Sequence, residues 1–143
     1  MFRNVLIAVV VLLTFVWVTA GLAEMKEGLW EITTKTEIKG MPTQMPATTT
    51  RQCITKNDVV PKPERQEKGQ ECKIKDQKIS GDTVTYVIEC NDKSGTTIEV
   101  SGKTTYKGKV LDGVSTTNIK SKGQGNMQMT SKMSGKYVGS CPK

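Results

Sequence analysis

The stretch GLWEITTKTEIK, residues 28–39, decides the fold class of this chain. Large apolar and threonine side chains occupy every second position, and charged side chains occupy most of the positions between them. One face of an extended chain would hold Trp30, Ile32, Thr34, Thr36 and Ile38. The opposite face would hold Glu31, Thr33, Lys35, Glu37 and Lys39. A period of two residues is typical of a β-strand with one buried face, so the sequence predicts a strand here.

Six further runs with β-strand character follow, and turns rich in Gly, Asn and Asp separate several of them. They cover residues 47–54, 72–79, 83–90, 96–107, 110–119 and 127–137. Residues 55–60 (TKNDVV) predict one short helical turn after the second strand, which Pro61 and Pro63 end. We therefore expect an all-β domain, a small antiparallel barrel or sandwich of about seven strands.

The first 23 residues have the three parts of a secretory signal peptide. Arg3 supplies the positive charge, residues 5–18 form an apolar run, and small residues follow at Ala20, Gly21 and Ala23. We expect cleavage after Ala23, with cleavage after Ala20 as the alternative. An uncleaved anchor is the other interpretation, but the run is shorter than the ~20 residues that a transmembrane helix needs.

Residues 24–143 are then a single domain, without a transmembrane segment in the mature form and located in the periplasm or outside the cell. Four cysteines lie in this part, at positions 53, 72, 90 and 141. An even number of cysteines in an oxidising compartment favours two disulfides. Zinc sites pair their ligands at spacings of two to four residues, which this chain lacks.

The expected topology suggests which cysteines pair. Cys72 and Cys90 lie at the open end of one hairpin, nearly opposite each other about the turn at Gly81 and Asp82. If they pair, Cys53 pairs with Cys141. That second link would bring the last strand antiparallel to the first and close the sheet.

Several ordered motifs resemble a bacterial secreted family that is catalogued only as domain of unknown function 3617. They are GLWE at 28–31, GMPTQMP at 40–46, Gln52-Cys53, SGDTVT at 80–85 and SGKYVGSC at 134–141. The resemblance covers nearly the whole mature chain. It implies an exported protein of Gram-negative bacteria with one small β domain, and it implies no activity and no catalytic residue.

The composition argues against catalysis and against nucleic acid as a partner. The chain has no His, the commonest general acid or base. Glu31, Glu37 and Glu99 are expected on outward faces beside lysines, so paired carboxylates are not expected to work together. The net charge is +7, but the lysines are spread along the chain rather than gathered in one block. We expect no enzyme activity, no cofactor and no nucleic-acid partner.

Met127, Met129 and Met133 share one face of the last strand with Tyr137. Thioethers suit Cu(I), which makes a soft-metal site one interpretation. The favoured interpretation is that these methionines are core, because Met fills irregular gaps. Trp30 presents a similar choice between plugging one end of a barrel and lining a ligand mouth, and its inward position favours the plug.

The inward faces contain many Thr, Ser and Gly, so the barrel would be thinly filled or hollow. Small barrels can enclose a ligand, and the leading hypothesis is therefore a non-enzymatic exported protein that binds a small apolar ligand or an envelope component. The residues expected to line the cavity are Trp30, Tyr86, Tyr106 and Met127. The alternative is a structural or interaction module that docks on another envelope protein. The sequence does not predict the oligomeric state of the protein.

Overall fold

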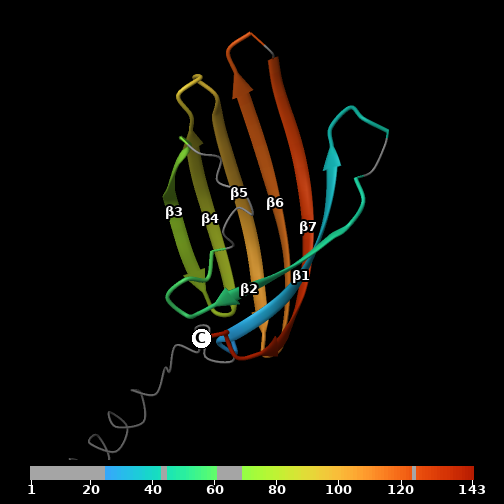
Figure 1. The fold of residues 1–143 in the computed structure, drawn as a ribbon, viewed down its shortest axis with the longest axis vertical. Coiled ribbons are helices and arrows are strands. Elements are labelled where there is room, and N and C mark those ends of the chain that lie inside the picture. The colour runs from blue at the N-terminus through green and yellow to red at the C-terminus, as the bar shows by residue number, and fades with distance from the viewer. Residues whose placement is uncertain (1–24, 43–44, 61–68, 124) are drawn as a thin grey trace, which may run out of the picture.

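Seven antiparallel strands form one curved sheet (Figure 1). The structure is a computed structural model that describes residues 25–42, 45–60, 69–123 and 125–143. The strands are β1 (Gly28–Ile38), β2 (Thr48–Ile54), β3 (Glu71–Ser80), β4 (Thr83–Asn91), β5 (Thr97–Lys107), β6 (Val110–Ser121) and β7 (Gly125–Gly139). The predicted all-β fold is confirmed. The predicted signal peptide and most of the connection from β2 to β3 lie outside the described residues.

The strand order is β2-β1-β7-β6-β5-β4-β3. Strands β3 to β7 form a meander, while β1 pairs with β7 and carries β2 on its other side. The predicted antiparallel pairing of the first and last strands is thus present. The sheet is nevertheless not closed, because its two edge strands, β2 and β3, do not pair with each other. The fold is an open barrel, and side chains from β2 and β4 face each other across its concave side.

Trp30 lies at the centre of the core at one end of the barrel, and its side chain is fully buried. Its ring meets Tyr106 edge-on at 6.0 Å and Tyr137 at 6.1 Å between centroids. The indole Nε1 donates a 2.9 Å hydrogen bond to the Lys26 carbonyl, so its polar group is satisfied. Edge-to-face packing and a paired N–H are the arrangement that a buried Trp favours. The indole therefore fills the core at this end of the barrel.

The chain after β2 makes a turn rather than the expected helical turn. Thr55 and Asp58 form an isolated antiparallel bridge, and the Asp58 amide donates to the Thr55 carbonyl at 3.0 Å. The described residues contain no helix. Val59 and Val60, which follow, are buried in the core. The Val59 carbonyl accepts a hydrogen bond from the Tyr106 hydroxyl of β5, so contacts with a strand distant in the sequence hold this segment in its turn.

Both predicted disulfides are present. Cys72 and Cys90 face each other directly across β3 and β4, with their Cα atoms 4.0 Å apart. Cys53 of β2 joins Cys141, which follows β7, over a sequence separation of 88 residues. Because β1 lies between β2 and β7, the second disulfide reaches across a neighbouring strand. Two disulfides are typical of proteins that mature in an oxidising environment.

Candidate functional site: a hydroxyl-lined hollow on the concave face

A hollow of about 380 Å³ lies on the concave face, above the aromatic core. Residues of β1, β2, β4, β5, β6 and β7 line it, together with Met45 from the β1–β2 loop. Successive residues of a strand point to opposite faces, so each strand contributes every second side chain. The hollow is thus built from the inward positions of nearly the whole sheet.

Hydroxyl side chains form one wall of the hollow. They come from β1, β2, β6 and β7, and are Thr34, Thr36, Thr48, Thr50, Ser115, Thr117 and Ser131. The register places Ser131 of β7 directly between Thr36 of β1 and Ser115 of β6. The Thr36 and Ser131 hydroxyls are 2.9 Å apart and hydrogen-bonded. This wall offers a row of groups that can each donate and accept a hydrogen bond.

Apolar side chains from β4 and β5 form the opposite wall, where Ile88, Cys90 and Val100 line the hollow. Ile32 and Met133 contribute further apolar surface on the side of β1 and β7. Ile88 and Cys90 are buried, and Val100 packs against them as part of the core. A molecule in the hollow would therefore meet an apolar surface on one side and hydroxyl groups on the other.

Tyr86 links the two walls. The hydroxyl end of its ring packs directly against Gly102 of the neighbouring strand, where a Cβ atom would overlap the ring. Burial raises the pKa of the Tyr86 hydroxyl, and the nearby hydroxyls of Thr104 and Ser115 partly offset this effect. The Thr104 side chain is fully buried, and its Oγ1 has no partner in full hydrogen-bond geometry among the described residues. Tyr86 therefore stays neutral and presents a polar group beside Ser115.

No charged side chain is present among the described residues that line the hollow. Charged residues make up 24% of the chain, so their absence from this described lining distinguishes the hollow from the rest of the protein. An ionised group placed in such a site would lose its hydration without gaining an opposite charge. A general acid or base with a carboxyl, amine or imidazole group is likewise missing from this described lining. The arrangement suits reversible binding of an uncharged molecule.

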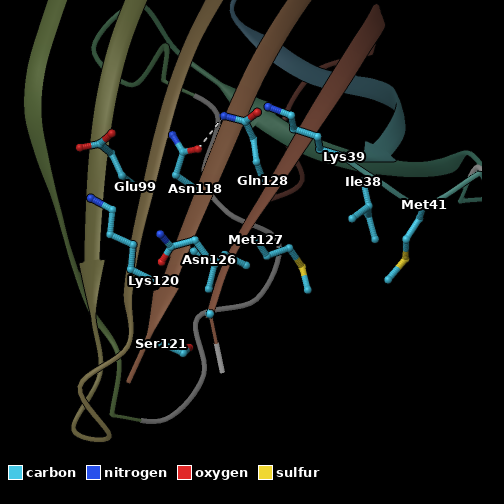
Figure 2. A pocket seen from close by; sticks show the side chains of 12 residues that line it. Ile38, Lys39, Met41, Glu99, Asn118, Lys120, Ser121, Asn126, Met127 and Gln128 are labelled. Atoms are coloured by element: carbon cyan, nitrogen blue, oxygen red, sulfur yellow. Dashed lines mark hydrogen bonds between the residues drawn. The ribbon is translucent and has the colours of Figure 1, made fainter. Parts of the chain in front are cut away.

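The structure separates the four residues that the sequence suggested for a ligand site. Tyr86 lines the hollow, whereas Trp30 and Tyr106 pack against each other in the core. Met127 lies far along β7, beside a second hollow of about 650 Å³. Figure 2 shows this second hollow, with Met127, Met41 and Ile38 on one side and Asn118 and Gln128, which are hydrogen-bonded, on the other. The predicted set is therefore not one site.

Met127, Met129 and Met133 share one face of β7, with Ser131 between the second and the third, and their partners on neighbouring strands include Thr34, Ile38 and Ile119. Met127 and Met133 are six residues apart, which corresponds to about 20 Å along an extended strand. The two thioethers at the ends therefore cannot reach one ion. Among the described residues, no cluster of three or more Cys, Asp or Glu side chains is placed to hold a metal.

The hydroxyl wall is not among the site residues that the sequence predicts. The available signal was the run of threonines and serines at inward positions of the predicted strands, as at Thr34 and Thr36. Small polar residues at such positions are equally compatible with a core that buries little apolar surface and with a binding surface. The register between β1, β7 and β6 places several of these hydroxyls side by side on one wall, which the pattern of a single strand does not reveal.

The part of the chain that the structure describes holds no helix of the length and hydropathy needed to span a bilayer. Comparison with family models gives a match over residues 25–141 to the family described as "Protein of unknown function (DUF3617)". Searches of curated proteins and of solved structures gave no match.

Proposed function

This chain belongs to the DUF3617 family of proteins of unknown function, and we propose that it is a non-enzymatic exported protein that binds a small, uncharged, amphipathic ligand. The binding site is the hollow on the concave face. The observation that supports this proposal is the lining of the hollow, which combines an apolar wall, a hydroxyl wall and no described charged group.

The two walls set the chemistry of the ligand. Apolar surface removed from water contributes about 25 cal/mol per Å², so the β4–β5 side favours a hydrocarbon or ring surface. Buried hydroxyls need hydrogen-bond partners, so the other side favours oxygen or nitrogen atoms of neutral groups. The volume of about 380 Å³ lies near the lower end of the range for small-molecule sites, which points to a compact ligand.

Export to the periplasm or the exterior is part of the proposal. The N-terminal apolar run with Arg3 before it supports a signal peptide. The pairs Cys53–Cys141 and Cys72–Cys90 support maturation in an oxidising compartment. A ligand that reaches this protein would then be an envelope metabolite or a molecule from outside the cell.

Native mass spectrometry of the oxidised mature protein, purified from periplasm, tests the proposal. We expect an extra mass that leaves on mild denaturation, and its identification gives the ligand class. A variant in which the hollow is filled, Ser131→Leu, should lose the extra mass. Ser134→Leu is the matched control, because Ser134 lies on the exposed face of the same strand. Retention of the ligand by Ser131→Leu would contradict the proposed site.

The second candidate function is an interaction module that docks on another envelope protein through a strand edge. The observation that favours it is the contrast between the two edges. β3 carries Lys73, Lys75 and Lys78, which is typical of an edge protected from pairing. β2 (TTTRQCI) has no lysine, and among the described strands it pairs only with β1. A bare monomer in native mass spectrometry would favour this candidate over ligand binding.

A further inference from the structure

Three hairpin connections lie at the same end of the barrel, far from the aromatic core. They are the β1–β2, β4–β5 and β6–β7 connections, and Figure 1 shows all three at the upper end of the sheet. The C-terminus and the β5–β6 turn lie at the opposite, lower end (Figure 1). The connections project separately, so this end of the molecule has tips rather than a flat surface.

Exposed lysines are gathered on these tips. Lys39 follows β1, Lys93 lies in the β4–β5 turn, and Lys120 and Lys122 lie at the β6–β7 turn. Asp92 is the acidic residue among the described residues of the three connections. Its carboxylate accepts hydrogen bonds within its own turn, from the backbone amides of Ser94 and Thr96 at 2.8 and 2.9 Å and from the Ser94 hydroxyl at 2.6 Å. Glu99 lines the second hollow beside Lys39 and Lys120, so this end carries more lysines than acidic groups and has a net positive charge.

Two methionines stand beside these lysines with their side chains in solvent. Met41 is 57% exposed and Met127 is 43% exposed. Both line the second hollow together with Lys39 and Lys120 (Figure 2). Long apolar side chains that remain exposed beside cationic groups are typical of a surface that meets another apolar phase.

We propose that this end of the barrel docks on the surface of an anionic lipid bilayer. We define the docking surface as Lys39, Met41, Lys93, Lys120, Lys122 and Met127. The methionine side chains would enter the boundary between headgroups and acyl chains, while the lysine ammonium groups would contact lipid phosphates. The proposal stands on residues outside the concave hollow and does not depend on a ligand there.

The shape of this end favours a bilayer over an acidic protein. A stable protein interface buries about 800 Å² on each partner in a continuous, well-packed patch. Here the three connections at this end project as separate tips (Figure 1), and Lys39, Lys93 and Lys122 each lie in a different one of them. A fluid headgroup layer can fill the space between such tips, whereas a folded protein surface would have to be matched to them.

Vesicle sedimentation with the oxidised mature protein tests this inference. Vesicles of phosphatidylcholine and phosphatidylglycerol in equal amounts should bind the protein at low salt, and vesicles of pure phosphatidylcholine should not. A lysine near an anionic surface contributes about a fivefold gain in partitioning. We therefore expect Lys39→Ser/Lys120→Ser to bind about 25-fold more weakly. Met41→Ser/Met127→Ser should lose the binding that remains at high salt, where charge attraction is screened.

The matched control is Lys107→Ser/Lys109→Ser, which removes the same charge from exposed positions at the β5–β6 turn. This variant should bind the anionic vesicles within about twofold of the unaltered protein, since its lysines would face away from the lipid. Absence of binding to anionic vesicles, or equal weakening by the control, would overturn the inference. It is also overturned if the methionine variant binds normally and soluble polyglutamate captures the protein equally well, which would indicate an acidic protein partner. Circular dichroism of each variant verifies that the sheet is intact.

Discussion

The hydroxyl of Tyr106 donates a 2.6 Å hydrogen bond to the backbone carbonyl of Val59, 47 residues earlier in the chain. Both groups are buried, and burial strongly raises the pKa of the Tyr106 hydroxyl, so it remains a donor at every ordinary pH. The bond ties the segment after β2 to the inner face of β5. It therefore fixes this segment against the aromatic core, where Tyr106 packs on Trp30.

We expect Tyr106→Phe to destabilise the protein by about 1–3 kcal/mol, because the Val59 carbonyl would be left buried without its partner. Urea unfolding followed by tryptophan fluorescence measures this difference. Tyr137→Phe is the control, since Tyr137 also packs against Trp30 but no hydrogen bond of its hydroxyl is present among the described residues. Equal effects of the two substitutions would show that the Tyr106 bond contributes nothing specific.

The two disulfides should contribute unequally to stability. Loop-closure entropy predicts about 3 kcal/mol for Cys72–Cys90, whose sequence separation is 18 residues, and about 4.6 kcal/mol for Cys53–Cys141, whose separation is 88. We therefore expect the Cys53→Ala/Cys141→Ala variant to unfold at lower denaturant than the Cys72→Ala/Cys90→Ala variant. The reverse order would mean that native-state packing around the hairpin, rather than loop length, governs the difference.

Gly102→Ala should destabilise the sheet by about 1–3 kcal/mol, because the added methyl group would overlap the ring of Tyr86. The same substitution made in a Tyr86→Leu background should cost less, since the ring is then absent. A double-mutant cycle by denaturant unfolding gives the coupling between the two positions. Zero coupling would contradict the packing of Tyr86 over Gly102.

Acid should weaken an ion-pair group on the outer face of β1. Glu31 contacts Lys136 and Arg51, each at 3.1 Å. Hydrogen bonds from Lys136 and then Arg51 lower the pKa of Glu31 below its ordinary value of 4.5. A lowered carboxyl pKa gives stability that is present above the unfolded-state value and is lost as pH falls through the folded-state value.

We therefore expect Glu31→Gln to show a smaller loss of stability than the unaltered protein when the pH falls from neutral to well below 4.5. Unfolding curves across this range measure the effect, and it should shrink at high salt because the site is exposed. Glu37→Gln is a useful comparison, since Glu37 lies on the same face with a longer contact of 3.7 Å to Lys132. Identical pH profiles for all three proteins would contradict the assignment.

The sequence alone predicted the strands, their inward positions and the disulfide pairs, because each depends on local alternation or on hairpin geometry. Trp30 and Ile32 illustrate this, since their alternation with charged residues places them in the core. The turn at Thr55 was not predicted, because burial of Val59 and Val60 depends on contacts with distant strands. The open edges and the hydroxyl wall depend on sheet curvature and register, which single-strand patterns do not contain.

The position of β7 between β1 and β6 has a consequence for the order in which the chain can acquire its structure. Synthesis delivers the chain from the N-terminus, so β7 is made last. Until residues 125–139 emerge, the β1–β2 hairpin and the β3–β6 meander are two separate pieces, since β7 is the strand that joins them in the described sheet. Pairings that span so much sequence form slowly. The sheet can therefore be completed only after nearly the whole chain has been made, and under the proposed export a precursor without β7 could cross the membrane before the sheet closes on it.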